Sequence, residues 1–431
     1  MIANVANIVQ KGWCTGCGIC ELVCPSNAVE MFYDKIRGIY YPLIRAHRCN
    51  NCGLCLKVCF GAMISSVNYE KMRTYESILG KYLACYIGFA TDKKIRFKAS
   101  SGGIVTALLV FLLENKYVDG AIVTKIEAGN PPLAKAFVAK SKEEIIAASG
   151  SKYCPVLLND AFKSLEPGKR YVFVGLPCQI FAVKRLAEFN KFVKDSIKLY
   201  IGLFCGGTPS YNGTIYLLRK YGLKDHNIQQ IRYRGEGWPG SLRIQTRSES
   251  LNIPYTEYWP LISPWFHLSI CMICIFGLSP QSDISCGDAW FPELVKKDKQ
   301  GTSILVSRSD FGNKVLHEAE ERHAVKLQQI HPSSVIKAQK AMILFKHYRL
   351  NARLRVLHLF QKDYKLKSSA YSINRINLSD YFDEIIMFIG RYLASHKNLW
   401  ILFDLYRTAL KGFTSFYAQL KCYLTYILRR L

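Results

Sequence analysis

The sequence predicts a small α+β domain built on a cysteine repeat, followed by an α/β domain with a mainly parallel sheet, a β-rich segment and a basic helical tail. Three observations support this order. Eight of the 16 cysteines lie in two short runs near the N-terminus. From Lys81 onward, strand-like runs alternate with helical runs, which is typical of α/β domains. After about Pro332, apolar residues recur at helical spacing.

The length and composition indicate a globular chain of more than one domain. The 431 residues are 50% hydrophobic and 21% charged, as in ordinary globular proteins. The segment Met1–Gln10 lacks the basic start and long apolar core of a secretory signal. We therefore expect a cytoplasmic chain whose clustered cysteines are metal ligands rather than disulfides.

The cysteine repeat has a spacing that chemistry explains. It reads Cys14-x2-Cys17-x2-Cys20-x3-Cys24-Pro25 and recurs as Cys49-x2-Cys52-x2-Cys55-x3-Cys59-Phe60. This is the signature of bacterial ferredoxins with two [4Fe–4S] clusters, in which the fourth cysteine of each run ligates the other cluster. A zinc-binding repeat is the alternative, but zinc does not need this triple spacing. The predicted ligands are Cys14, Cys17, Cys20 and Cys59 for the first cluster and Cys49, Cys52, Cys55 and Cys24 for the second.

The rest of this ferredoxin-like dicluster domain, residues 1–64, follows from the repeat. Between its halves, Val29–Tyr33 and Gly38–Leu43 are predicted to be short strands around a turn. Phe60 replaces the proline that usually follows the last cysteine, a small departure because proline ligates nothing. Residues 61–80 are predicted to be a connector.

The central part alternates between predicted strands and helices, which favours a mainly parallel sheet. We divide it into residues 81–165 and 166–330. Gly-rich and Cys-bearing loops follow several strands, where such sheets bind their ligands. The predicted strands are Cys85–Ala90, Gly120–Thr124, Arg170–Val174 and Ile197–Phe204, and the predicted helices are Ile104–Lys116, Lys142–Ala148 and a helix ending at Phe189.

Residues 228–310 are predicted to be β-rich and irregular. The stretch Tyr258–Ser282 contains no Asp, Glu, Lys or Arg and is long enough to span a bilayer. Because Pro260 and Pro264 interrupt it and Cys271 and Cys274 lie inside it, we interpret it as a buried loop around a cofactor.

The basic tail, residues 331–431, is predicted to be helical and amphipathic. Residues 333–431 carry 17 Lys/Arg against five Asp/Glu, within a chain of net charge +26. This charge is compatible with an acidic redox partner, an anionic membrane surface or simple solvation. No nucleic-acid-binding motif accompanies it, so we expect no nucleic-acid partner. Peripheral membrane contact competes with packing of Phe388, Trp400 and Phe403 onto the body of the protein.

Further segments stand out beyond the repeat. The segment Ser100–Leu109 opens a helix with small residues, where backbone N–H groups suit a phosphate. Gly175–Gln179 and Gly202–Gly207 each place a cysteine at a strand end. The last pair is Cys271–Cys274, followed by Ser282–Trp290.

In this order, the segments resemble the coenzyme F420 hydrogenase/dehydrogenase beta-subunit family over roughly residues 1–310. Arg234–Gly240 and Gly301–Val306 also fit it, and Cys271–Phe276 is most similar to bacterial members often encoded among surface-polysaccharide genes. The resemblance implies a bound FAD, a third [4Fe–4S] cluster and flavin-mediated hydride exchange. Cys286 stands where another residue type is expected and competes for a place among the cluster ligands. The implied flavin loop is Ser100, Ser101, Gly102 and Gly103, and the implied third-cluster ligands are Cys178, Cys205, Cys271 and Cys274.

The expected function is electron transfer between [4Fe–4S] clusters and a flavin that exchanges hydride with a deazaflavin-like or other small molecule. A flavin connects these steps because it accepts one or two electrons. The expected partners are a redox protein or a small hydride donor or acceptor, and the expected location is the cytoplasm, at the inner membrane face if the tail binds lipid. The alternative is a non-catalytic electron carrier in a larger complex, linked to surface-polysaccharide biosynthesis. No catalytic side chain is identified.

Overall fold

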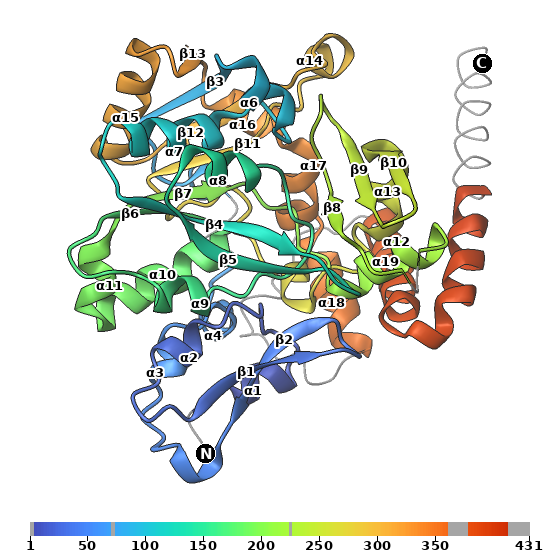
Figure 1. Cartoon of the computed structure of the whole chain (residues 1–431). Coiled ribbons are helices and arrows are strands. Elements are labelled where there is room, and N and C mark those ends of the chain that lie inside the picture. The colour runs from blue at the N-terminus through green and yellow to red at the C-terminus, as the bar shows by residue number, and fades with distance from the viewer. Residues whose placement is uncertain (1–3, 70–73, 224–225, 361–377, 413–431) are drawn as a thin grey trace, which may run out of the picture.

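The computed structural model describes residues 4–69, 74–223, 226–360 and 378–412, and Figure 1 shows their arrangement. The N-terminal domain contains a two-stranded antiparallel sheet, β1 (Val29–Asp34) and β2 (Ile39–Ile44), which confirms the two predicted strands. Short helices surround the cysteine runs. They are α1 (Ala6–Gln10), α2 (Ile19–Leu22), η1 (Ala46–Arg48), α3 (Leu54–Lys57) and α4 (Phe60–Ile64), with α5 (Tyr75–Leu79) leading out of the domain.

An eight-stranded sheet forms the centre of the described molecule, in the order β13-β3-β12-β11-β7-β6-β4-β5. Its four central strands, β11, β7, β6 and β4, are parallel to their neighbours within this group, as the sequence predicted. The outer strands pair antiparallel, so the sheet as a whole is mixed. The strands are β3 (Ala84–Ala90), β4 (Gly120–Glu127), β5 (Leu133–Ala139), β6 (Tyr171–Gly175), β7 (Ile197–Leu203), β11 (Ile284–Asp288), β12 (Ser303–Ser307) and β13 (Val325–Gln329).

Helices cover both faces of this sheet. One hydrophobic core lies under α7 (Ile104–Glu114), α8 (Lys142–Ala147) and α15 (Asp310–Glu321). The other lies under α9 (Asn159–Lys163), α10 (Pro177–Phe189) and α11 (Lys191–Ser196). A further short helix, α6 (Lys93–Lys98), follows β3. The parallel strands β6 and β7 end immediately before Cys178 and Cys205, so the sheet brings both cysteines to one edge.

The predicted β-rich segment divides between two sheets. Three of its strands form a separate antiparallel sheet in the order β10-β9-β8, whereas β11 and β12 extend the main sheet. The sequence did not predict this division. The elements are β8 (Gln230–Arg232), β9 (Ser241–Gln245), β10 (Ser250–Pro254), α13 (Tyr255–Ile262), η3 (Ser269–Met272) and α14 (Pro292–Lys297), with α12 (Tyr211–Lys220) preceding them.

The uncharged stretch Tyr258–Ser282 folds as part of α13, the short helix η3 and connecting loops. Most of its apolar side chains are buried, Ile262 and Ile273 completely. Among the described residues, every helix is too short or too polar to cross a membrane. The interpretation of this stretch as a buried loop is therefore confirmed.

The described part of the tail is helical. Trp400 and Phe403 are buried against the body of the protein, and Phe388 stacks on Phe360 with ring centroids 4.7 Å apart. This confirms the packing alternative for Trp400 and Phe403, whereas Phe388 is half-buried and stacks on a residue of the tail itself. Residues 361–377 and 413–431 of the predicted tail lie outside the described residues. The elements are α16 (Ser333–Ala338), α17 (Lys340–Ile343), the π-helix η4 (Leu344–Tyr348), α18 (Leu350–Phe360), α19 (Leu378–Ser395), η6 (Lys397–Leu399) and a helix over residues 400–412.

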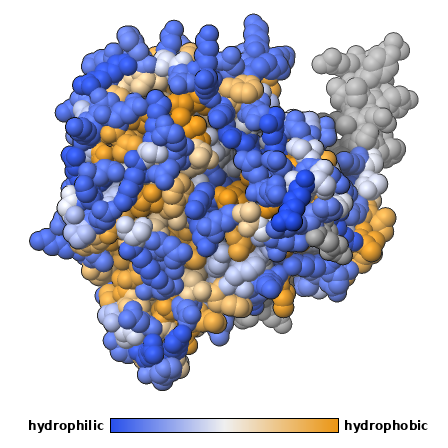
Figure 2. All heavy atoms as spheres, in the orientation of Figure 1, coloured by the Kyte–Doolittle hydropathy of each residue, from blue (hydrophilic) through white to orange (hydrophobic). Residues whose placement is uncertain are grey.

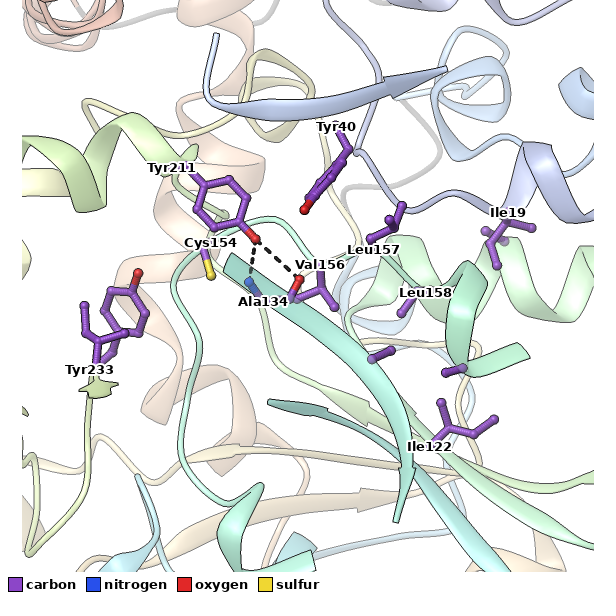
Figure 3. Close-up of a cluster of buried hydrophobic side chains, with 14 of the residues drawn as sticks. Ile19, Tyr40, Ile122, Ala134, Cys154, Val156, Leu157, Leu158, Tyr211 and Tyr233 are labelled. Atoms are coloured by element: carbon purple, nitrogen blue, oxygen red, sulfur yellow. Dashed lines mark hydrogen bonds between the residues drawn. The ribbon is translucent and has the colours of Figure 1, made fainter. Parts of the chain in front are cut away.

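The N-terminal domain shares a hydrophobic core with the main sheet (Figure 3). Tyr211 of α12 is central to it, because its hydroxyl accepts from Ala134 N–H (2.8 Å) and donates to Pro155 C=O (2.7 Å). Its ring contacts Tyr40 of β2 edge-on, with centroids 6.3 Å apart. The Leu158 N–H also donates to Cys17 C=O at 3.0 Å. Such packing and hydrogen bonding fix the two domains against each other.

Hydrophilic residues cover much of the face shown in Figure 2, and hydrophobic residues show between them. One hydrophobic group lies at the right-hand edge, where the helix of residues 400–412 lies in Figure 1. Ile401, Leu402 and Leu405 are among the exposed apolar side chains of that helix. The C-terminal helices thus bury one apolar side and expose part of another.

Candidate metal centres and cofactor site

The two halves of the cysteine repeat adopt the same local fold. Gly18 precedes α2 with φ 80°, and Gly53 precedes α3 with φ 71°. Only glycine adopts this left-handed conformation without strain. In each half of the repeat, this turn lets the backbone reverse direction after the first two cysteines and start the short helix that carries the third. The repeat seen in the sequence is therefore a repeat of structure.

The first predicted cluster site brings Cys14, Cys17, Cys20 and Cys59 together. Burial raises the pKa of each thiol, to about 12 for Cys59, and neighbouring thiols raise the pKa of Cys14, Cys20 and Cys59 further. The Gly16 N–H donates to Cys14 Sγ at 3.4 Å. Hydrogen bonds to sulfur are among the contacts that tune protein-bound clusters. A buried group of four such thiols is stable as thiolates only when a cation or metal cluster compensates them.

The second predicted cluster site is a cavity lined by Cys24, Cys49, Cys52 and Cys55, with about 310 Å³ of empty space including its mouth. Cys52 is exposed, so this site lies at the outer end of the domain. The Ala28 N–H donates to Cys24 Sγ at 3.2 Å. Partial burial would raise the pKa of Cys24, but this bond and the Ser26 hydroxyl lower it below its usual value.

The four cysteines predicted to hold a third cluster are spread over nearly a hundred residues of sequence. They nevertheless line one cavity, with about 540 Å³ of empty space including its mouth. Cys178 lies at the start of α10, Cys205 after β7, Cys271 in η3 and Cys274 just beyond it. Burial and the neighbouring thiols raise the pKa of Cys178 and Cys205, and that of Cys271 to about 12. The Thr208 N–H donates to Cys271 Sγ at 3.4 Å.

The donor chemistry of all three sites fits [4Fe–4S] clusters. Each site offers four cysteines, and every described cysteine is a free thiol. Within the described ranges, no three His, Cys, Asp or Glu side chains gather around a point as ligands of a single metal ion. A cubane holds its four irons at separate corners, so its cysteines lie farther apart than the ligands of one ion.

The first and third sites are neighbours. Thr15 and Phe60 of the N-terminal domain line the third cavity, and Cys17 is close enough to raise the pKa of Cys178. Phe60, which replaces the usual proline, packs edge-on against Phe181 (5.7 Å between centroids) and Phe276 (5.9 Å). The departure from the ferredoxin pattern therefore has a structural role: Phe60 fills the space between the two sites.

Two other cysteines lie in this region. Cys286 is in β11, buried in the core under α7 and 5% exposed, and does not line the third cavity. Cys154 does line the cavity, although it lies in no motif that would have singled it out. Burial raises the pKa of Cys154 to about 12, although the hydroxyls of Tyr233 and Tyr211 oppose the shift. Figure 3 shows its sulfur between these two tyrosines.

The implied flavin loop lies at the start of α7. Ser101 Oγ donates to Thr302 C=O at 3.1 Å, and the Gly102 N–H donates to Ser303 Oγ at 3.0 Å. A Cβ at Gly102 would lie 2.6 Å from Gly88 C=O, so only glycine fits there. Gly103 caps the helix with φ 78°. The loop is thus held tightly against β3 and β12, and FAD binding by these residues stays a prediction.

Two cations that the sequence did not single out lie beside this loop. The Ser151 N–H donates to Ser100 Oγ at 2.7 Å, which brings the segment Ser149–Lys152 against the loop. Lys152 Nζ donates to Gly150 C=O (2.8 Å) and Ser149 C=O (3.3 Å), and Arg232 donates to Ser149 Oγ (3.2 Å). Burial, with Arg232 nearby, lowers the pKa of Lys152 to about 7. Two neighbouring cations suit an anionic ligand.

The family-like segments around Arg234 and Asp288 form one buried ion pair. Arg234 is 2% exposed and donates to both carboxylate oxygens of Asp288 at 2.9 Å. Trp238 Nε1 donates to the same carboxylate at 2.8 Å. Burial disfavours the charged guanidinium, but Asp288 raises the pKa of Arg234 well above its usual value. This pair joins the three-stranded sheet to β11.

Two four-cysteine sites in a ferredoxin-type repeat define an iron–sulfur protein. Residues 13–61 match the model of the 4Fe–4S dicluster domain. Residues 85–163 match the N-terminal model of the coenzyme F420 hydrogenase/dehydrogenase beta subunit, and residues 168–333 match its C-terminal model. The chain belongs to the coenzyme F420 hydrogenase/dehydrogenase beta-subunit family.

Curated relatives agree with this assignment, and a solved structure has a similar fold. The coenzyme F420 hydrogenase beta subunit of Methanosarcina barkeri is 30% identical over 251 residues, which cover 56% of this chain and 80% of that subunit. The coenzyme F420-dependent sulfite reductase of Methanocaldococcus jannaschii is 26% identical over 348 residues, or 77% of this chain, and the match spans half of that relative. A chain of the F420-reducing [NiFe] hydrogenase complex of Methanosarcina barkeri has a similar fold, with a TM-score of 0.50 and 23% identity over 67% of this chain and 97% of that one.

Proposed function

We propose that the chain is a cytoplasmic iron–sulfur flavoprotein oxidoreductase that passes electrons between [4Fe–4S] clusters and a flavin, which exchanges hydride with a deazaflavin or another small molecule. The observation that carries this proposal is the row of three four-cysteine sites, from exposed Cys52 through the first site to the buried third cavity. Bound clusters carry one electron at a time, and a bound flavin converts single electrons into hydride.

The outer cluster site is the proposed point of electron exchange with a redox partner protein. Cys52 is exposed, and the exposed cations Arg48 and Lys57 lie near it in the sequence, whereas exposed Arg45 pairs with Glu30. Positive charge around a redox site attracts an acidic partner and speeds their encounter. Several relatives are subunits of hydrogenases and dehydrogenases, which supports a protein partner.

The loop Ser100–Gly103 and the cations Lys152 and Arg232 are the proposed FAD site. In this arrangement the two cations would offset the diphosphate charge, and the start of α7 would face it with backbone N–H groups. Neither cation forms an ion pair with a carboxylate of the described residues. An anionic ligand would therefore stabilise a pair of charges that otherwise repel each other.

FAD affinity is expected to depend on pH through Lys152. Its pKa of about 7 lies below the usual lysine value, so the ammonium is about half-charged at pH 7 and loses its charge at higher pH. Bound FAD favours the charged form, so affinity should fall as pH rises through 7 toward the pKa in the complex. Fluorescence titration of FAD at pH 6 to 9 measures this. Lys152→Met should weaken binding and flatten the profile, whereas exposed Lys142→Met should resemble the wild type; a wild-type profile in Lys152→Met contradicts the assignment.

A second candidate function is a non-catalytic electron carrier within a larger complex, which the subunit relatives favour. A link to surface-polysaccharide biosynthesis stays a prediction. Anaerobic purification with cofactor analysis, followed by reduction with deazaflavin and nicotinamide donors, tests the main proposal. We expect about twelve irons, at four per cubane, and bound FAD. One or two zinc ions per chain would refute it, and flavin-free protein that co-purifies with a larger enzyme would favour the carrier.

Peripheral membrane contact through the tail is also proposed, but through fewer apolar side chains than the sequence suggested. Trp400 and Phe403 are buried, which leaves Ile401, Leu402 and Leu405 as exposed apolar side chains on a basic segment. Apolar insertion and attraction to anionic lipid act together at such surfaces. Full-length protein should co-sediment with anionic liposomes, and a variant with all three residues changed to Ser should stay in solution. Equal sedimentation of both would exclude this surface.

A further inference from the structure

Lys346 is a buried cation in the cavity of the third cysteine site. It belongs to the π-helix η4, beyond residue 333, where the match to the family model ends. Its side chain lines the cavity together with Cys178, Cys205, Cys271 and Cys274. Lys346 is 2% exposed, and its Nζ donates to Cys274 C=O at 3.1 Å.

The charge of Lys346 has no carboxylate to balance it among the described residues. Nearby Arg353 differs, because it forms two bonds to Glu384, at 2.9 and 3.0 Å. Arg349 pairs with Glu384 and Asp383. Burying an ammonium without a counterion costs several kcal/mol. The titratable groups that line the cavity with Lys346 are Cys154 and the four predicted cluster cysteines. Thiolates of these four are therefore the source of compensating negative charge.

The surrounding chain makes room for this side chain. A Cβ at Gly277 would lie 3.0 Å from Lys346 Cδ and 2.9 Å from Met342 Sδ. Gly277 lies three residues after Cys274, and its carbonyl accepts from the Cys205 N–H at 2.8 Å. The segment that carries two of the cysteine positions is thus fitted around the lysine stem.

We propose that Lys346 is a positioning residue that supplies fixed positive charge beside the third [4Fe–4S] cluster and thereby raises its reduction potential; this rests on the proposed third cluster. Four thiolates give a cubane a net negative charge, and reduction adds one more. A cation in a low-dielectric cavity stabilises the reduced form more than the oxidised form. Net charge and exposure are known determinants of cluster potential. A raised potential would favour electron transfer from the neighbouring first site to the third cluster.

The test is a redox titration of anaerobically purified full-length protein, followed by electron paramagnetic resonance. Lys346→Met removes the charge and keeps the length of the side chain, Lys346→Arg keeps the charge, and Lys340→Met removes an exposed charge one element earlier. Lys346→Met should shift one cluster signal to a more negative potential and leave the two ferredoxin-type signals unchanged. Lys346→Arg should retain a potential closer to that of the wild type, and Lys340→Met should have the same potential as the wild type.

The outcomes separate this inference from the proposed function. If Lys346→Met keeps about twelve irons and the wild-type potentials, the inference is wrong and the third cluster stands. If wild-type protein holds only about eight irons, the third cluster itself is refuted, and the inference with it. If Lys346→Met loses iron, Lys346→Gln is titrated in its place, because it is neutral but keeps a hydrogen-bond donor. An unchanged potential in Lys346→Gln would equally overturn the inference.

Discussion

Cys274→Ser is expected to remove about four of about twelve irons per chain, because a cubane holds four irons and needs its fourth thiolate. The ferredoxin-type signals should remain, since Cys274 lines only the third cavity. Flavin reduction from the ferredoxin side should be blocked, while direct hydride exchange between flavin and substrate persists in part. Iron analysis and stopped-flow absorbance measure these effects.

A matched control is available in the same domain. Cys286→Ser changes a buried cysteine that lies outside the cavity, in the core under α7. It should leave iron content and flavin reduction at wild-type values. If Cys274→Ser behaves like Cys286→Ser in both measurements, the four cavity cysteines are structural thiols and the electron path proposed above is wrong.

Arg234→Met is expected to lower the free energy of unfolding by about 3 kcal/mol, the lower end of the range for breaking a buried ion pair. The lower end applies because Asp288 is 18% exposed and keeps some contact with water. The change leaves that carboxylate and the Pro239 carbonyl without their common partner, while Trp238 Nε1 still donates to the carboxylate. Anaerobic urea denaturation should show a lower midpoint at an unchanged slope.

Arg243→Met provides the comparison for this prediction. Arg243 lies in β9, near Arg234 in sequence, but its pairing with Glu236 is exposed. Its removal should cost less than about 1 kcal/mol, as is usual for surface pairs. In Arg234→Met, a further Asp288→Leu change should recover part of the loss, since it removes the unpaired charge. Equal midpoints for Arg234→Met and Arg243→Met would show that the pair does not stabilise the fold.

The grouping of the repeat cysteines into two sites could be predicted from the sequence because the spacing within each run is local. Each run places three cysteines within seven residues, with a turn at Gly18 or Gly53 just before the third. This local pattern defines most of a site without knowledge of the fold. Placement of the fourth cysteine, Cys59 or Cys24, required only the known exchange of ligands between repeats. The structure brings the same residues together.

The sheet was predicted less completely because its outer pairs join distant segments. Residues of β3 pair with β12 and β13, more than 200 residues later, and both pairings are antiparallel. Period and propensity describe each strand separately and carry no information on such a partner. The parallel strands at the centre of the sheet could be predicted from the sequence, because each of them is followed by a helix or a loop of recognisable type.

The buried lysines were missed for a physical reason. Lys152 and Lys346 occur in segments without a motif, and a single lysine is far more often exposed than buried. One signal was present at Lys346, which follows the apolar run Ile343–Phe345. A charge directly after an apolar run is a reason to look for a buried partner, but that partner can be identified only from the folded structure.

The shared core around Tyr211 has a consequence for how quickly the protein can turn over. Proteins that carry electrons on a hinged domain must wait for that domain to swing, which makes the internal step sensitive to solvent viscosity. Here Tyr40, Tyr211 and the bond from Leu158 to Cys17 hold the N-terminal domain in one position. The distance between the first and third sites is therefore constant, and on the electron path proposed above the internal step would be governed by tunnelling rather than by diffusion. Any dependence on viscosity would then report the arrival of the partner alone.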